Sequence, residues 1–316
     1  MSNFASGYIK YINHLEQIND AAVSCPERMI QEVEESYNEH LQNIARNIAT
    51  HRNKVKICML SGPSSSGKTT TAHLFQKYLK DFGITAYIVS MDNYYLPREF
   101  LPKNPDGSMD FETVNAIDIS QIEKCLLEII SDGVISVPNY DFGFGKPVGE
   151  NSVFDIKEND IVIMEGIHGL NPVFTRHVPQ ENLIKLYVSV KQQIKDANGE
   201  VISPYDIRLV RRIVRDMKFR NTNPEGTLSM WDNVVDGENR YIRPYRLSAD
   251  YTVNSIHIYE PCVLRTIAIP SLRMIAEDSP YYRKARELES RLMRFEPISP
   301  DLVPGSSMLM EFIGSR

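Results

Sequence analysis

The chain has 316 residues, 42% of them hydrophobic, which suits one large or two small domains with a sizeable core. Its 35 lysines and arginines against 41 aspartates and glutamates give a net charge of −6, which argues against general nucleic-acid or membrane-surface binding. Because the four cysteines include no C-x-x-C pair and no apolar run approaches membrane-spanning length, we expect a cytoplasmic protein with buried free thiols and no zinc site.

The first 52 residues carry two helical patterns. A short amphipathic piece spans residues 8–18, and Pro26 fits the first position of a longer helix. Apolar side chains then recur every three or four positions, which predicts one buried face: Met29, Val33, Tyr37, Leu41, Ile44 and Ile48. We interpret residues 1–52 as a helical extension packed on a core domain of residues 53–316. An arm for self-association in a homo-oligomer, or for another partner, is the alternative.

Residues 62–69 read Gly-Pro-Ser-Ser-Ser-Gly-Lys-Thr and match the phosphate-loop pattern G-x-x-x-x-G-K-[ST]. An apolar strand signal at 55–60 precedes the loop, and helical spacing at 72–82 follows it. Lys68 can reach the β- and γ-phosphates of a nucleoside triphosphate, and Thr69 can offer its hydroxyl to Mg²⁺. The residues expected to bind the nucleotide are Gly62, Pro63, Ser64, Ser65, Ser66, Gly67, Lys68, Thr69 and Thr70.

Strand and helix signals then alternate to about residue 200, which is typical of a parallel α/β sheet flanked by helices. Strands are predicted at 85–90, 134–137, 161–164 and 183–190, and a helix at 119–130.

Polar residues at the carboxyl ends of these strands are candidates for the site, because ligands collect there in open sheets. Asp92 follows one strand and can accept a proton from an attacking hydroxyl or hold a metal-bound water. Glu165 ends another, where phosphate-loop proteins place a carboxylate for Mg²⁺. A helix cap and a solvated strand end are the respective structural alternatives.

Two segments, Asp110-Phe111-Glu112 and Tyr140-Asp141-Phe142, place acids beside aromatic rings on loops. Such pairs can clamp a nucleoside, because carboxylates accept hydrogen bonds from ribose hydroxyls while rings cover the base. The same pairs also occur as ordinary loop packing.

Basic residues are concentrated between positions 208 and 220: Arg208, Arg211, Arg212, Arg215, Lys218 and Arg220. Arg208, Arg212 and Arg215 share one side of a helix, and only Asp206 and Asp216 lie nearby in sequence. This pattern favours an arginine-rich helical lid over phosphates, mobile without ligand at about residues 204–227, rather than a solvated basic helix.

In chain order these segments resemble the uridine kinase and phosphoribulokinase-like group of phosphate-loop kinases. The matching segments are residues 62–69, Ser90-x-Asp92-x-Tyr94-Tyr95, Tyr140-Asp141-Phe142, Glu165-Gly166-Ile167 and residues 208–216. A bacterial-type nucleoside kinase branch is more similar still, through Asp110-Phe111-Glu112, Glu165-Gly166-Ile167-His168-Gly169-Leu170-Asn171, Met230-Trp231, Gly237-Glu238, Asn254-Ser255 with Tyr259-Glu260, and Glu311-Phe312-Ile313-Gly314. The resemblance spans roughly residues 25–316.

The resemblance implies Mg²⁺-assisted transfer of the γ-phosphoryl group of ATP to the 5′-hydroxyl of a small-molecule nucleoside, with uridine or cytidine expected first. Asp92 would be the general base, and Thr69 and Glu165 would hold Mg²⁺. The catalytic residues would be Asp92, Lys68, Arg215 and Arg220. The substrate would be bound by Tyr95, Asp110, Tyr140 and Arg212.

The chain departs from the uridine kinase pattern at two places. Uridine kinases carry a histidine shortly after Tyr-Asp-Phe that reads the pyrimidine, whereas residues 143–146 here are Gly-Phe-Gly-Lys. They also carry an arginine just after the lid's Arg-Gly, whereas Arg220 is followed by Asn221 and Thr222. The base preference therefore stays open, and we expect His168 to be a loop or core histidine. Alternative functions are a kinase for a sugar phosphate or pantothenate, and a nucleotide-binding regulator without transfer activity.

Overall fold

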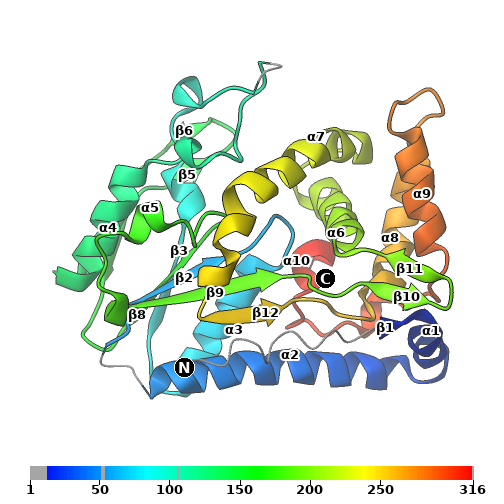
Figure 1. Cartoon of the computed structure of the whole chain (residues 1–316), viewed down its shortest axis with the longest axis horizontal. Coiled ribbons are helices and arrows are strands. Elements are labelled where there is room, and N and C mark those ends of the chain that lie inside the picture. The colour runs from blue at the N-terminus through cyan, green and yellow to red at the C-terminus, as the bar shows by residue number, and fades with distance from the viewer. Residues whose placement is uncertain (1–12, 51–53, 105–106, 132, 315–316) are drawn as a thin grey trace.

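A computed structural model describes residues 13–50, 54–104, 107–131 and 133–314. Its centre is a five-stranded sheet in which every strand is parallel to its neighbours, in the order β12-β9-β2-β8-β3 (Figure 1). The strands are β2 (Ile57–Ser61), β3 (Ala86–Ser90), β8 (Ile161–Glu165), β9 (Leu183–Ser189) and β12 (Tyr251–Asn254). The predicted parallel α/β fold is therefore confirmed, and four of the five strands coincide with predicted apolar runs.

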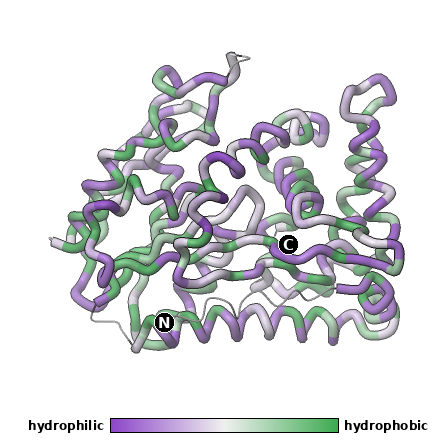
Figure 2. Tube along the Cα trace, viewed as in Figure 1, coloured by the Kyte–Doolittle hydropathy of each residue, from purple (hydrophilic) through white to green (hydrophobic). Residues whose placement is uncertain are grey.

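Both faces of the sheet are buried, which explains why its central strands are continuously apolar. Cys58 and Leu60 of β2 face one core cluster, whereas Ile57 and Met59 face the other. The helices α2 (Pro26–Ala49) and α3 (Lys68–Asp81) contribute to the first cluster, and α4 (Ile119–Ser131) and α5 (Pro172–Thr175) to the second. In Figure 2 the central strands are largely hydrophobic, whereas α2 alternates between hydrophobic and hydrophilic positions.

The N-terminal extension packs on the core domain. Pro26 opens α2 as predicted, and Tyr37 from its apolar face shares a hydrogen bond of 2.6 Å with the Thr71 hydroxyl of α3. The preceding helix, α1, spans Leu15–Ser24 and includes the end of the predicted piece at 8–18, whose residues 8–12 lie outside the described part. The thiol prediction is wrong for Cys25 between α1 and α2, which is exposed; the other three cysteines are buried.

Several short strands depart from the sequence prediction. The strand β4 (Val134–Val137) forms, but it pairs antiparallel with β7 (Ser152–Asp155) outside the central sheet. Nearby, β5 (Tyr140–Asp141) pairs with β6 (Lys146–Pro147). The sheet strand β12 was not predicted, and neither was the small sheet of β1 (Asn13–His14), β10 (Ile194–Asp196) and β11 (Gly199–Ile202). These strands have two to four residues, too few for a periodic signal.

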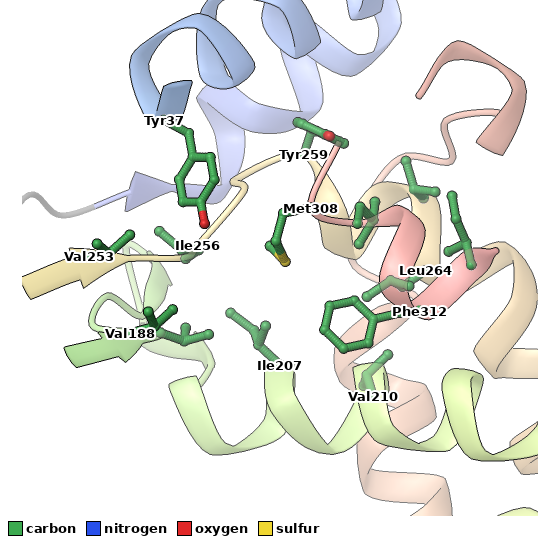
Figure 3. Packing of buried hydrophobic residues seen from close by; sticks show 14 of the residues in the cluster. Tyr37, Val188, Ile207, Val210, Val253, Ile256, Tyr259, Leu264, Met308 and Phe312 are labelled. Atoms are coloured by element: carbon green, nitrogen blue, oxygen red, sulfur yellow. The ribbon is translucent and has the colours of Figure 1, made fainter. Parts of the chain in front are cut away.

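The C-terminal half is mostly helical: α6 (Pro204–Phe219), α7 (Pro224–Gly237), α8 (Glu260–Arg273), α9 (Tyr282–Leu292) and α10 (Met310–Ile313). A capping box fixes the start of α6, because Ser203 and Asp206 exchange side-chain and backbone hydrogen bonds. Side chains from α6, α8, the sheet and the C-terminal segment meet in one buried cluster (Figure 3). Within the described residues, no helix is long and apolar enough to cross a bilayer.

Candidate active site

The phosphate loop joins β2 to α3, as predicted. A Cβ on Gly62 would lie 2.1 Å from the Val188 carbonyl oxygen, so the backbones approach too closely for any side chain. Gly67 has a φ of 87°, and a Cβ there would lie 2.6 Å from the Met308 sulfur. The carbonyl of Pro63 accepts hydrogen bonds from the Ser66 N–H at 3.2 Å and the Lys68 ammonium at 3.2 Å. These contacts fix the curled loop.

Arginines of α6 hold the loop from the other side. Arg208 donates to the Ser64 carbonyl at 3.2 Å, and Arg212 donates to the Ser64 hydroxyl at 2.7 Å. The hydroxyls of Ser65 and Ser66 are buried and have no hydrogen-bond partner among the described residues. Because buried polar groups in native proteins are nearly always paired, these hydroxyls indicate a place for a polar ligand or water.

The next three residues begin α3. Burial lowers the pKa of the Lys68 ammonium, and the nearby carboxylates of Glu165, Glu311 and Asp92 oppose that effect. The Thr69 side chain is exposed. Thr70 is already engaged, because its N–H and hydroxyl donate to Glu311 at 3.2 and 3.1 Å. Glu311, which the sequence analysis named only as part of a family motif, thus contacts the phosphate loop.

Asp92 and Glu165 meet because β3 and β8 are adjacent in the sheet, with Ser90 paired to Glu165. The Ser90 hydroxyl donates to Glu165 at 3.2 Å and accepts from the Asp92 N–H at 3.3 Å. Only 7% of Glu165 is exposed, so it is not a solvated strand end. Ser90, rather than Asp92, caps the 3-10 turn Met91–Tyr94, so the capping alternative for Asp92 also fails.

The electrostatic setting of these two carboxyls explains how they can act. Burial raises the pKa of Glu165 to about 7, with Lys68 opposing and Asp92 adding to the shift. The Asp92 side chain stays accessible to solvent, yet the protein around it raises the pKa of its carboxyl, while Lys68, Arg220 and Arg215 lower it. The positive charges of Lys68, Arg215 and Arg220 therefore act on the Asp92 carboxyl.

One buried carboxylate organises the arginines nearest the loop. Asp216, which is 2% exposed, lies 3.3 Å from Arg212, 2.8 Å from Arg215 and 3.6 Å from Arg220. Three guanidinium groups around one carboxylate leave an excess of positive charge facing the loop. Phosphate oxygens are the ligands that such a cluster binds well.

Two arginines of α6 are tied into the protein by buried ion pairs. Arg208 forms a buried ion pair with Glu238, and Arg211 forms another with Glu260 in which neither side chain is exposed. The prediction considered only acids nearby in sequence, whereas these two partners lie 30 and 49 positions away. Most of α6 is buried in the core. A mobile lid could therefore consist only of the end of α6 and the turn after it.

Aromatic rings cluster on the segments that follow β3 and β4, the first of which also carries Asp92. The Tyr95 ring lies 6.0 Å from the Tyr140 ring and 5.6 Å from the Phe142 ring, measured between centroids. Both tyrosine hydroxyls are engaged by backbone, since Tyr95 donates to the Phe111 carbonyl at 2.8 Å and Tyr140 to the Leu96 carbonyl at 3.2 Å. Tyr95 is buried, whereas Tyr140 is partly exposed and Phe142 is 49% exposed, so Tyr140 and Phe142 supply the ring surface that a planar ligand could contact.

Asp110 and Glu112 lie on one turn but have different surroundings. One oxygen of Asp110 accepts from the backbone N–H groups of Glu112 and Thr113, at 3.0 and 3.1 Å, and so fixes its own turn. Glu112 is the acid that senses the site: burial raises its pKa to about 7, and Arg212 and Lys68 oppose that shift. Both acids of this segment are therefore candidates for binding the substrate, and the predicted role of Asp110 stays a prediction.

His168 follows Glu165 on the same loop and is 1% exposed. Neither ring nitrogen has a hydrogen-bond partner among the described residues, and the ring lies edge-on to Tyr241 at 6.2 Å between centroids. Burial lowers the pKa of His168 to about 4, so the imidazole is neutral at pH 7. It is a buried loop histidine, as expected.

The residues present fit a magnesium–phosphate site better than a site built from protein ligands alone. In the described residues no group of three or more His, Cys, Asp or Glu side chains could hold a metal ion. Glu165 and the exposed Thr69 hydroxyl supply oxygen ligands of the kind that Mg²⁺ takes together with substrate phosphates and waters.

Comparison with known proteins agrees with this geometry. The sequence model of the Phosphoribulokinase / Uridine kinase family matches residues 57–260. Uridine kinases of Clostridium novyi and Lactobacillus helveticus are each 28% identical, over 61% and 63% of this chain and 84% and 86% of theirs. The uridine kinase of Ureaplasma urealyticum serovar 10 is 25% identical, over 62% of this chain and 86% of its own.

Solved structures support the fold. A candidate fructose transport system kinase from Silicibacter sp. TM1040 matches with a TM-score of 0.51 and 19% identity, over 67% of this chain and 98% of that one. YFH7 from Saccharomyces cerevisiae, a P-loop protein with a circular permutation, matches with the same TM-score and 13% identity, over the same shares.

Proposed function

Because the chain belongs to the phosphoribulokinase/uridine kinase family and is therefore a kinase, we propose that it transfers the γ-phosphoryl group of ATP to the 5′-hydroxyl of a nucleoside, uridine or cytidine first. The observation that carries this proposal is the position of Asp92. It follows β3 at the carboxyl edge of the sheet, next to Glu165 of the adjacent strand β8, and the Ser90 hydroxyl links the two through hydrogen bonds of 3.3 and 3.2 Å. A general base for phosphoryl transfer must lie between donor and acceptor, and ligands of open parallel sheets collect at this edge.

The donor side would work through the phosphate loop. Residues 62–70 would hold the phosphates with backbone N–H groups and the Lys68 ammonium. Thr69 and Glu165 would hold Mg²⁺, which supplies charge neutralisation on the phosphates when bound. Glu165 would then carry its full negative charge, because the cation offsets the burial that otherwise raises its pKa.

The acceptor side would be defined by the aromatic cluster and the neighbouring acids. Tyr140 would cover the base with its ring and the buried Tyr95 would support it from behind, because both hydroxyls already donate to backbone carbonyls. Glu112 would accept the ribose hydroxyls, and Asp110 would contribute its second oxygen while fixing the turn. Asp92 would take the proton of the 5′-hydroxyl as that oxygen attacks.

Arginines would stabilise the transferring group. Arg212 is held by Ser64 and Asp216 at the edge of the loop, and it would lie beside phosphates bound there. Arg215 and Arg220 would supply positive charge where negative charge develops in the transition state. Because Asp216 pre-orders all three, little reorganisation would be needed at the moment of transfer.

Two other functions compete with this proposal. A kinase for a sugar phosphate or pantothenate would use the same phosphate loop, but such acceptors have no planar base to place against the rings of Tyr140 and Phe142. A regulator without transfer activity would not need Asp92, Lys68 and Glu165 to converge. The convergence of these three groups favours an enzyme.

The test is a panel of acceptors with MgATP and coupled detection of ADP. It includes uridine, cytidine, adenosine, pantothenate, D-ribulose 5-phosphate and no acceptor. We expect turnover with a pyrimidine nucleoside and a loss on the order of 10² or more in Lys68→Ala, because a preorganised charge is removed. Turnover confined to a non-nucleoside acceptor, or none that depends on an acceptor, would reject the proposal.

A further inference from the structure

Glu311 lies in α10, near the C-terminal end of the described chain, and reaches back to the phosphate loop. Its Oε2 accepts hydrogen bonds from the Thr70 N–H at 3.2 Å and from the Thr70 hydroxyl at 3.1 Å. The two residues are 241 positions apart, so the contact depends wholly on the tertiary fold.

The N–H that Glu311 engages is one that a nucleotide would use. Thr70 is the third residue of α3, and the first four N–H groups of an α-helix have no partner within the helix. Gly67 offers no side-chain cap, and the first turn of α3 contains no acidic residue. In a phosphate loop these N–H groups cradle phosphate oxygens. The Glu311 carboxylate thus accepts a hydrogen bond from the Thr70 N–H, a donor that bound phosphates would otherwise use.

The backbone that carries Glu311 is firmly held. Met308 packs against Gly67, and the Phe312 ring lies 5.1 Å from the Arg211 guanidinium. Met308 and Phe312 both belong to the buried cluster in Figure 3. The Ser307 hydroxyl shares a hydrogen bond of 3.1 Å with Tyr259, which also donates to Glu34 at 2.5 Å. Glu311 itself is only half-buried. Its side chain can therefore turn away without moving the segment.

The charge of Glu311 faces the cations of the site. It raises the pKa of the Lys68 ammonium, alongside Glu165, against the lowering by burial. It acts in the same direction on Arg220. A triphosphate bound by Lys68 and Arg220 would lie close to the Glu311 carboxylate. The two anions would repel each other unless the Glu311 side chain moved away.

We propose that Glu311 is a built-in competitor for the nucleotide: its carboxylate occupies a phosphate-binding donor in the free protein and turns away when a nucleoside di- or triphosphate binds. The inference rests on the proposed nucleotide binding by the loop and is independent of which acceptor is phosphorylated. It makes Glu311 a residue that sets the nucleotide affinity.

The experiment compares Glu311→Gln with the wild type by titration calorimetry against MgADP, MgATP and adenosine. The glutamine keeps an oxygen that can accept from Thr70 but removes the charge, so we expect ADP and ATP to bind about tenfold more tightly. Adenosine, which has no phosphate, should bind equally to both proteins. Glu277→Gln is the matched control, because Glu277 is exposed and the same charge is removed.

Unchanged or weaker ADP and ATP binding in Glu311→Gln would overturn the inference and leave Glu311 as a structural cap or a ligand of the nucleotide. If neither protein bound any nucleotide at millimolar concentration, the proposed function would fail and the inference with it. A crystal structure of the wild-type MgADP complex tests the inference without relying on the folding of the variant. We expect Glu311 to have left Thr70 in that complex, and an intact contact would contradict the proposal.

Discussion

Asp92 is the general base of the proposed phosphoryl transfer. Asp92→Asn keeps the size of the group but removes its ability to accept the hydroxyl proton. We therefore expect ATP binding to persist while kcat for the nucleoside falls by about 10² or more. Steady-state kinetics beside calorimetric ATP titration measures both quantities. If kcat survives while ATP affinity collapses, Asp92 serves Mg²⁺ rather than the acceptor.

Glu112 gives a prediction about stability and pH. Its pKa in the folded chain is about 7, above the ordinary 4.5, so between these values the folded state holds a proton that the unfolded state has released. The free energy of unfolding therefore falls as pH rises through this window, and Glu112→Gln removes that contribution. Thermal unfolding of both proteins from pH 5 to 8 should show the variant gaining stability relative to the wild type. A difference that does not change with pH would show that Glu112 is solvated.

These two residues also show what a single sequence can and cannot supply. Asp92 was identified because it directly follows a strand of a parallel sheet, and such strands end at a common edge. Asp110 was assigned to the substrate only through the family resemblance, because nothing in the order acid, ring, acid says which carboxylate fixes the turn. The hydrogen bonds of Asp110 with Glu112 and Thr113, which fix the turn, become visible only in the structure.

At the scale of the element, α6 combines a structural and a functional set of arginines. Arg211 is fully buried against Glu260, so Arg211→Met would strand a buried carboxylate and cost about 3–5 kcal/mol of stability. Arg215→Ala leaves Asp216 paired with Arg212 and Arg220, so its stability should fall by less than about 1 kcal/mol.

Urea unfolding and kinetics of the two variants separate the roles. Arg215→Ala should lose transfer activity on the order of 10²-fold while staying folded, because a charge at the transferring phosphate is missing. Loss of stability in both variants, with activity per folded molecule retained, would make α6 a purely structural helix.

Hydrogen exchange locates the part of α6 that moves. Leu209 and Val214 are buried, so residues 209–214 should be protected even without ligand. Arg220, whose side chain is 58% exposed, begins the turn that leads to α7. Residues 220–223 should exchange rapidly in the free protein and slow only when ATP and nucleoside are both bound. Slow exchange of residues 220–223 without ligand would show that this segment is not a mobile lid.

At the scale of the whole molecule, local patterns predicted the framework and missed the long-range ties. The phosphate loop, its flanking strand and helix, and α2 with its apolar face all follow from spacing within about 25 residues. The contacts of Glu311 with Thr70 and of Arg211 with Glu260 join distant segments, and no periodicity encodes them. The division at residue 52, the cytoplasmic location and self-association stay predictions.

The most direct test of the account is the product formed from uridine and MgATP by the wild-type protein. Phosphorus NMR and mass spectrometry of the reaction should identify uridine 5′-monophosphate in amounts equal to the ADP released. 5′-Deoxyuridine, which lacks the attacking hydroxyl, should give no phosphorylated product. Phosphate on the 2′- or 3′-oxygen, or ADP released at the same rate with and without nucleoside, would contradict the proposed function.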